Sequence, residues 1–261
     1  MKLGIIGYGN MGSAILSGVL EKKIIKKDKI FVFDIDKNKT KNLQVNVVEN
    51  CRKVVENSDV IIIAVKPKDL NSVFKDIKDF LNDKKITISV MAGIKIKKIE
   101  EIVGDRIPVI RIMPNLNVKV KAGIIVYCLN KYAKKYENIV KKIFLPIGVV
   151  FKLPENKFDT ITAISGSGPG FLFYIAEELK KICVEKGISG KISKDLISYL
   201  FYGTGKMLIE TKIDPERLKQ MVSSPGGTTI AGLSVFEKRK FGEILKQVIE
   251  AAEKRSKELS F

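Results

Sequence analysis

Apolar residues in the first half of the chain recur in short runs that are separated by amphipathic stretches. Runs of strand length occupy residues 2–7, 29–34, 45–48, 60–65, 86–90, 108–112, 123–129 and 148–153. Helical periodicity is found at residues 10–20, 69–80, 95–102 and 133–144. Strands that alternate with helices are typical of a parallel sheet with crossover helices. The pattern therefore predicts an α/β domain over residues 1–154.

The pattern changes after Pro154, where runs of β-branched residues end and every periodic stretch is helical. A glycine-rich break at residues 165–169 interrupts the first of these helices. Ser193 is expected to cap the N-terminus of the next helix, and Asp214 followed by Pro215 is expected to cap another. A final pair of helices should begin near residue 229. Residues 155–261 are therefore predicted to form an all-α domain, with no flexible linker before it.

A glycine-rich segment closes the first predicted strand and opens the first helix. It reads Gly7, Tyr8, Gly9, Asn10, Met11 and Gly12, which fits the GxGxxG fingerprint of a Rossmann-type dinucleotide-binding domain. The first glycine permits a tight turn, the second lets a pyrophosphate approach the backbone, and the third lets helix and strand pack closely. The helix N-terminus then faces the anion. We expect a cofactor site here, with Met11 chiefly in the core and Tyr8 either beside the cofactor or on the surface.

Two signals after the second strand conflict over which nicotinamide cofactor is bound. Asp34 lies where an acidic residue would hydrogen-bond the adenosine ribose of NADH. Lys37 and Lys39 follow closely, and they would either hold the 2′-phosphate of NADPH or belong to a solvated loop. The sequence therefore predicts NADPH or NADH as the cofactor and does not choose between them.

A second glycine-rich segment, at residues 222–230, joins two predicted helices in the helical half. It places free backbone N–H groups and several hydroxyls at a helix N-terminus, which is a suitable site for a small anion such as a carboxylate. The alternative is a capped turn that lets two helices pack tightly. The segment is thus either a cradle for a substrate carboxylate or a structural turn.

Charge and composition narrow the classes of function. The chain has a formal net charge of +18, but its lysines are spread along the sequence without interleaved aromatic residues, so we do not expect nucleic-acid binding. It has no histidine and three isolated cysteines, so neither a metal site nor a disulfide is expected. Its apolar runs are too short for a secretory signal or a membrane span. We expect a soluble cytoplasmic protein with no membrane partner.

The chain resembles the pyrroline-5-carboxylate reductase family over nearly its whole length. The resemblance is carried by the glycine fingerprint, by Ala64-Val65-Lys66-Pro67, by Met113-Pro114-Asn115, by residues 162–169 and by residues 222–233. The last two stretches are specific in combination, because a generic dinucleotide-binding domain would not carry them. Departures from the family pattern are modest and are found at Asn117, Gly170, Phe171 and Lys212.

The resemblance implies that the chain reduces L-1-pyrroline-5-carboxylate to L-proline, with hydride passing from C4 of the nicotinamide to the imine carbon. It implies that Asn50 contacts the adenosine ribose. The nicotinamide half would be lined by Ala64, Val65, Lys66 and Pro67. The substrate carboxylate and imine would be held by Ser224, Gly226, Gly227, Thr228 and Thr229. The all-α half would be a dimerisation domain, giving a homodimer with interleaved helical domains that can assemble further into a ring.

Thr229 is the candidate catalytic residue, because the chain has no histidine and this hydroxyl is the proton partner that the segment offers. It would either relay a proton to the ring nitrogen or orient an iminium that binds already protonated. Two rival functions remain. A β-hydroxyacid dehydrogenase or another imine reductase would carry a catalytic lysine in the helical half, in an arrangement that we do not find. A non-catalytic nucleotide-binding relative would have lost the fingerprint or residues 224–229, and both are intact.

Overall fold

The computed structural model describes residues 1–259 and divides the chain into two compact units. Unit 1 comprises Met1–Ser167 together with the residues from Ala252 onward, and unit 2 comprises Gly168–Ala251. The change of pattern expected at residue 154 lies within unit 1, just after its last strand. No helix within residues 1–259 is long and apolar enough to cross a membrane.

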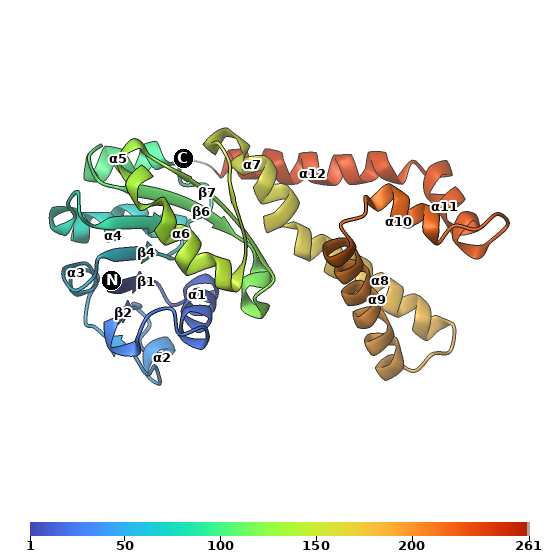
Figure 1. Cartoon of the computed structure of the whole chain (residues 1–261), viewed down its shortest axis with the longest axis horizontal. Coiled ribbons are helices and arrows are strands. Elements are labelled where there is room, and N and C mark those ends of the chain that lie inside the picture. The colour runs from blue at the N-terminus through green and yellow to red at the C-terminus, as the bar shows by residue number, and fades with distance from the viewer. Residues whose placement is uncertain (260–261) are drawn as a thin grey trace. The chain divides into compact units, whose positions relative to one another are not determined.

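Unit 1 is built on an eight-stranded sheet with the order β3-β2-β1-β4-β5-β6-β7-β8 (Figure 1). The strands are β1 (Leu3–Ile6), β2 (Ile30–Phe33), β3 (Asn46–Val47), β4 (Val60–Ile63), β5 (Ile86–Ser89), β6 (Val109–Pro114), β7 (Gly123–Leu129) and β8 (Gly148–Lys152). They confirm the strands predicted from the sequence. Six of the seven neighbouring pairs are parallel, whereas β6 and β7 are antiparallel. The link between β6 and β7 holds only a 3₁₀ turn, Leu116–Val120, which is too short for a parallel crossover.

Helices pack on both faces of this sheet, as the alternating sequence pattern predicted. They are α1 (Asn10–Glu21), α2 (Lys37–Thr40), α3 (Cys51–Glu56), α4 (Leu70–Ile77), α5 (Ile96–Val103), α6 (Glu137–Phe144) and α7 (Phe158–Ile161). Successive strand residues point to opposite faces, so Ile5 and Ile62 join one buried cluster while Ile6 and Ile63 join the other. Strands buried on both faces explain why these runs are continuously apolar.

The helix is interrupted at the glycine-rich stretch, as expected, by a π-helical turn, Thr162–Gly166. It follows α7 and precedes α8 (Gly168–Glu185) in the chain. The Ser165 hydroxyl donates to the Ile161 carbonyl at 3.0 Å, so it satisfies a backbone group of the turn. The buried Asn115 amide donates to the Ser165 carbonyl at 3.2 Å and so ties the turn to the end of β6.

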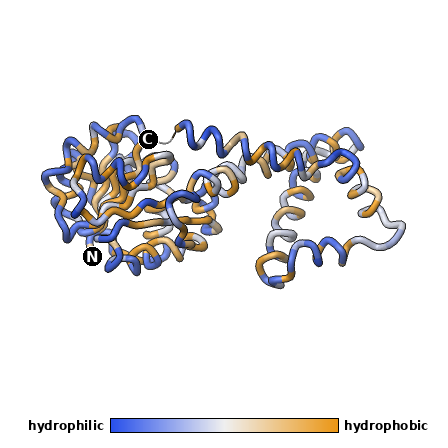
Figure 2. Tube along the Cα trace, turned by 90° about the horizontal axis from the view of Figure 1, so that it is seen from above, coloured by the Kyte–Doolittle hydropathy of each residue, from blue (hydrophilic) through white to orange (hydrophobic). Residues whose placement is uncertain are grey.

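Unit 2 consists of helices with very little core of their own. They are α8, α9 (Gly190–Thr211), α10 (Pro215–Met221), α11 (Thr228–Lys238) and most of α12 (Phe241–Glu258). Pro169, Ser193 and Ile197 are the residues of unit 2 that are buried. Large apolar side chains such as Tyr199, which is 74% exposed, and Ile209, which is 76% exposed, lie on the surface of these helices. Figure 2 shows apolar segments along the helices of this unit.

One predicted helix start in unit 2 is wrong and another is confirmed. Helix α9 begins at Gly190, and its N-cap is Ser189, whose hydroxyl accepts from the Ile192 N–H. Ser193 lies inside the helix, where its hydroxyl donates to the Ser189 carbonyl at 2.9 Å. Asp214 caps α10 as expected, since its carboxylate accepts from the Glu216 N–H at 2.9 Å.

Candidate active site

The three glycines of the fingerprint each meet a different spatial requirement. Gly7 has φ +95°, and a Cβ there would lie 2.6 Å from the Ala64 carbonyl oxygen. A Cβ on Gly12 would lie 2.0 Å from the Gly7 carbonyl oxygen, so only glycine lets α1 approach β1 this closely. A Cβ on Gly9, in contrast, would have nothing within 4 Å. The open space at Gly9 fits a pyrophosphate against the backbone at the start of α1.

The fingerprint lies where the order of the sheet reverses. Strand β1 pairs with β2 on one side and with β4 on the other, and the chain then builds outward in both directions. Ligands of open α/β sheets bind outside the carboxyl ends of the strands at such a switch point. Gly7, Asp34 and Ala64 directly follow β1, β2 and β4, so the structure brings these three predicted residues to one edge of the sheet.

A cleft of about 480 Å³ opens at this edge. It is lined by Ile6, Gly7, Gly9, Phe33, Asp34, Ile35, Lys39, Cys51, Ala64, Val65, Lys66, Lys68, Asp69, Ser72, Val73 and Asp76. Six of the predicted cofactor residues are among them. Sequence reasoning missed Ile35 and the contribution of α4, namely Ser72, Val73 and Asp76. Only the packing of α4 beside β4 brings the α4 residues to the cleft, and no motif marks them.

Other residues of the fingerprint and its flanks support the cleft without lining it. Tyr8 is half-buried, burial raises the pKa of its phenol, and its side chain packs against the core. Met11 also packs against the core, as expected. Asn10 is exposed, and its side-chain oxygen accepts from Lys119 at 3.4 Å. These contacts hold the loop and the start of α1 in place.

Three predicted cofactor residues lie just outside the cleft. Asn50 caps α3, where its side-chain oxygen accepts from the Lys53 N–H at 2.9 Å. Pro67 begins a 3₁₀ turn, Pro67–Asp69, after β4. Lys37 lines a neighbouring cavity of about 590 Å³ between α2 and β3. Their contacts with a cofactor remain predictions.

Asp34 is the most constrained polar group of the cleft. Its side chain is buried, and its two carboxylate oxygens accept from the Tyr8 N–H at 2.6 Å and from the Asp36 N–H at 2.9 Å. The ammonium of Lys39 lies 3.4 Å from the same carboxylate. Asp34 thus connects the end of β2 to the glycine loop and has a fixed orientation.

The predicted substrate segment lies in unit 2, between α10 and α11. Gly226 has φ +73°, which favours glycine, and a Cβ on Gly227 would lie 2.6 Å from the Ser224 hydroxyl oxygen. Gly227 is the N-cap of α11, and no side chain caps this helix. The first N–H groups of α11 and the hydroxyls of Thr228 and Thr229 are therefore available to an anion.

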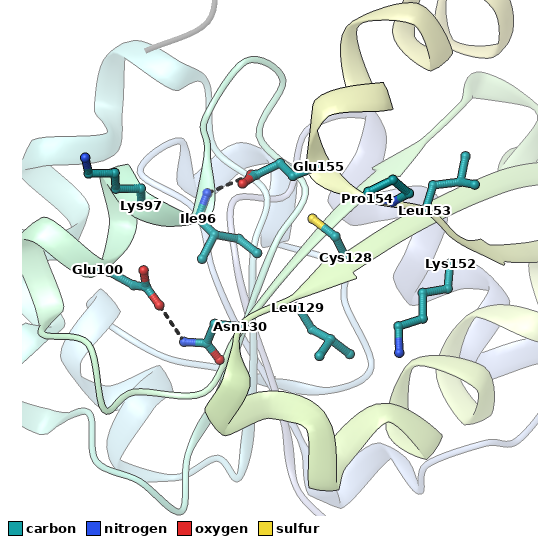
Figure 3. Close-up of a pocket in the computed structure, with 10 residues that line it drawn as sticks. All are labelled: Ile96, Lys97, Glu100, Cys128, Leu129, Asn130, Lys152, Leu153, Pro154 and Glu155. Carbon is teal, nitrogen blue, oxygen red and sulfur yellow. Dashed lines mark hydrogen bonds between the residues drawn. The ribbon is translucent and has the colours of Figure 1, made fainter.

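A further cavity of about 610 Å³ lies at the end of β7 and beside α5 (Figure 3). Its polar side chains are engaged in holding the fold. Asn130 donates to Glu100 and to the Ile107 carbonyl, both at 2.8 Å. Glu155 accepts from the Ile96 N–H at 2.8 Å and from Arg111 at 2.9 Å. Burial raises the pKa of the Cys128 thiol in its wall to about 12, so this thiol has little thiolate character near neutral pH.

Comparison with known proteins identifies the two halves. Residues 155–259 match the family model described as pyrroline-5-carboxylate reductase dimerisation, and residues 2–93 match that described as NADP oxidoreductase coenzyme F420-dependent. The pyrroline-5-carboxylate reductase of Aquifex aeolicus is 33% identical over 99% of this chain and 97% of its own length. That of Arabidopsis thaliana is 36% identical over 99% and 95%. The chain belongs to the pyrroline-5-carboxylate reductase family.

A solved structure of a relative agrees with the sequence comparison. The pyrroline carboxylate reductase of Plasmodium falciparum, described with NADP bound, is 35% identical and superimposes with a TM-score of 0.90. The match covers 100% of this chain and 98% of that one. The resemblance stated from the motifs is therefore confirmed, as are the Rossmann-type domain followed by a helical domain and the class of NAD(P)H-dependent oxidoreductase. The matched dimerisation domain points to a homo-oligomer.

Proposed function

We propose that this chain reduces the cyclic imine L-1-pyrroline-5-carboxylate to L-proline with NAD(P)H, the last step of proline biosynthesis. The observation that carries the proposal is the presence, in one chain, of an intact glycine loop at the switch point and an uncapped helix N-terminus at Thr228. Curated relatives of this name match nearly the full chain, which supports the same reaction.

The backbone of unit 1 fits a dinucleotide. Bound NAD(P)H would supply the hydride from C4 of its nicotinamide. The open face of Gly9 and the N-terminus of α1 would receive the pyrophosphate, and Asp34 would face the adenosine ribose. Residues 64–67, which follow β4, would line the nicotinamide half, and Ala64 to Lys66 do line the cleft.

The segment before α11 would hold the substrate. A carboxylate fits the free N–H groups of the first turn, where the helix dipole favours an anion. The positive φ of Gly226 and the contact between Gly227 and Ser224 shape the backbone for this purpose. Five residues would form the cradle, namely Ser224, Gly226, Gly227, Thr228 and Thr229.

Thr229 would act at the ring nitrogen in one of two ways. If it relays a proton, Thr229→Val should lower kcat strongly, because the transition state loses its proton path. If it orients a substrate that is already protonated, the same variant should raise KM with kcat largely kept. Thr229→Ser keeps the hydroxyl and is the matched control, expected to stay close to the parent in both cases. An unchanged KM and kcat in Thr229→Val would exclude both roles.

The proposed active form is a homodimer with interleaved helical domains, which assembles further into a ring. The matched dimerisation domain and the apolar surfaces of unit 2 support the dimer. The proposed compartment is the cytoplasm, and the three free cysteines are in keeping with a reducing environment.

The test is oxidation of NADH, and separately of NADPH, when L-1-pyrroline-5-carboxylate is added to the purified protein. We expect rapid turnover, with proline as the product. Binding of the cofactor without turnover would refute the proposed reaction and favour a non-catalytic role.

A further inference from the structure

The segment that follows β2 decides between the two cofactors, because NADPH differs from NADH only by a phosphate on the adenosine 2′-oxygen. We infer that this chain binds NADH more tightly than NADPH, and that Asp34, Ile35 and Asp36 make the distinction. This preference rests on the cofactor site proposed above.

The negatively charged carboxylate of Asp34 is held in a fixed position. Its two oxygens accept from the backbone N–H groups of Tyr8 and Asp36, at 2.6 and 2.9 Å, and its side chain is only 8% exposed. A carboxylate offers about four acceptor positions, so it still accepts a ribose hydroxyl. A 2′-phosphate at the same place would meet a fixed like charge.

The cation nearest to Asp34 is shared between two acids. The Lys39 ammonium lies 3.4 Å from the Asp34 carboxylate and 3.9 Å from that of Asp36. One positive charge therefore faces two negative charges at the ribose end of the cleft. Binding a phosphate to Lys39 would require it to leave both carboxylates, and these would then repel the phosphate.

The other lysines near α2 line a neighbouring cavity and not the cleft itself. Lys37 and Lys41 line the space between α2 and β3, whereas Lys39 lines the cleft that contains the glycine loop. The two spaces meet at Phe33 and Asp34, which line both, so a phosphate that approached Lys37 or Lys41 would still pass the Asp34 carboxylate. Lys66 and Lys68 also line that cleft, but they follow β4, which lies on the opposite side of β1 from β2. They are therefore placed for the pyrophosphate and nicotinamide half.

The side chain of Ile35, the third residue of this segment to be considered, cannot hydrogen-bond a phosphate. It lines the cleft and is 90% exposed. An apolar side chain has no hydrogen-bond donor, while it can contact the face of an adenine. The run Asp34-Ile35-Asp36 thus combines an acceptor for ribose hydroxyls, an apolar surface and a second negative charge.

The experiment measures the dissociation constants of NADH and NADPH for the full chain by isothermal titration calorimetry, without substrate and at fixed ionic strength. We expect NADPH to bind about tenfold more weakly or worse. In Ile35→Arg/Asp36→Ser, NADPH affinity should rise about tenfold while NADH affinity stays within about twofold. Ile35 is exposed, and serine can replace Asp36 as the N-cap acceptor of α2, so this variant should fold.

Lys41→Ala is the matched control, because it removes one positive charge from the same region at a residue that does not line the cleft. It should leave the ratio of the two dissociation constants unchanged. The inference is overturned if the parent protein binds NADPH as tightly as NADH, or if the double variant leaves the ratio unchanged.

These outcomes are separate from failure of the proposed reaction. Equal dissociation constants overturn the preference and leave the reaction standing. A clear preference for NADH without reduction of L-1-pyrroline-5-carboxylate refutes the reaction and leaves the preference standing. If neither cofactor binds, both are overturned.

Discussion

The buried pair between Arg111 and Glu155 should be among the most sensitive points of unit 1. Arg111 is 4% exposed, and its guanidinium lies 2.9 Å from the Glu155 carboxylate and 4.6 Å from the centre of the Phe158 ring. The same carboxylate accepts from the Ile96 N–H at 2.8 Å. Glu155 thus ties β6 and α5 to the segment that leaves the sheet after β8.

Removing the Glu155 carboxylate leaves the buried guanidinium of Arg111 without its ion-pair partner. Loss of one partner of a buried ion pair costs about 3–5 kcal/mol. Glu155 is 30% exposed, so water partly replaces it and the lower end applies. We therefore expect Glu155→Ala to reduce the free energy of unfolding by about 3 kcal/mol. Glu155→Gln keeps an oxygen for the two donors and should lose less.

The assay is urea unfolding followed by circular dichroism, with all variants at one protein concentration because the stability of the proposed homodimer would depend on it. Glu101→Ala is the control, since Glu101 forms an exposed pair with Lys98 at 3.5 Å and should change stability by less than about 1 kcal/mol. If Glu155→Ala were no more destabilising than this control, the pair would not hold the segment and the reasoning would fail.

Three more outcomes are expected. Gly12→Ala should destabilise the fold by about 2 kcal/mol, because the new Cβ would lie 2.0 Å from a carbonyl oxygen. Gly9→Ala, where the added Cβ meets open space, should keep its unfolding midpoint and lose cofactor affinity in calorimetry. Equal stability of the two variants would contradict this reasoning. Burial raises the pKa of the Cys51 and Cys128 thiols to about 12, so below that pH little thiolate is present. Alkylation at pH 8, followed by mass spectrometry, should therefore be far slower at these two positions in the folded protein than in urea, and similar rates would refute their burial. Asp214→Ala should lower the free energy of unfolding by about 1 kcal/mol through loss of the α10 cap, and Asp214→Ser, which keeps an acceptor, should recover most of it in the same urea assay.

Much of the fold could be predicted because it depends on local signals. The apolar runs gave the strands of unit 1, and the spacing of Gly7, Gly9 and Gly12 located the loop that the structure places at the switch point. The start of α9 was misplaced because a serine serves equally well as an N-cap or, inside a helix, as a donor to the carbonyl four residues back. Ser189 takes the first role and Ser193 the second.

The remainder depends on contacts between distant segments. The antiparallel direction of β7 follows from the short link after β6, and a strand's own residues do not record its direction. Val73 and Asp76 reach the cleft only because α4 packs beside β4. The roles of Lys37 and Lys39, which are two positions apart, separate only when each is seen to line a different cavity.

The lack of a core in unit 2 would make folding a bimolecular event in the homodimer proposed above. In that homodimer, helices such as α9, which carry Tyr199 and Ile209 on their surface, would gain burial from a second copy, so their stability would rise with the logarithm of chain concentration. A newly made chain would then be vulnerable to proteolysis until it meets a partner. A destabilising substitution in α9 would also act twice in every such dimer. A defective copy made beside a normal one would then weaken the normal copy by pairing with it.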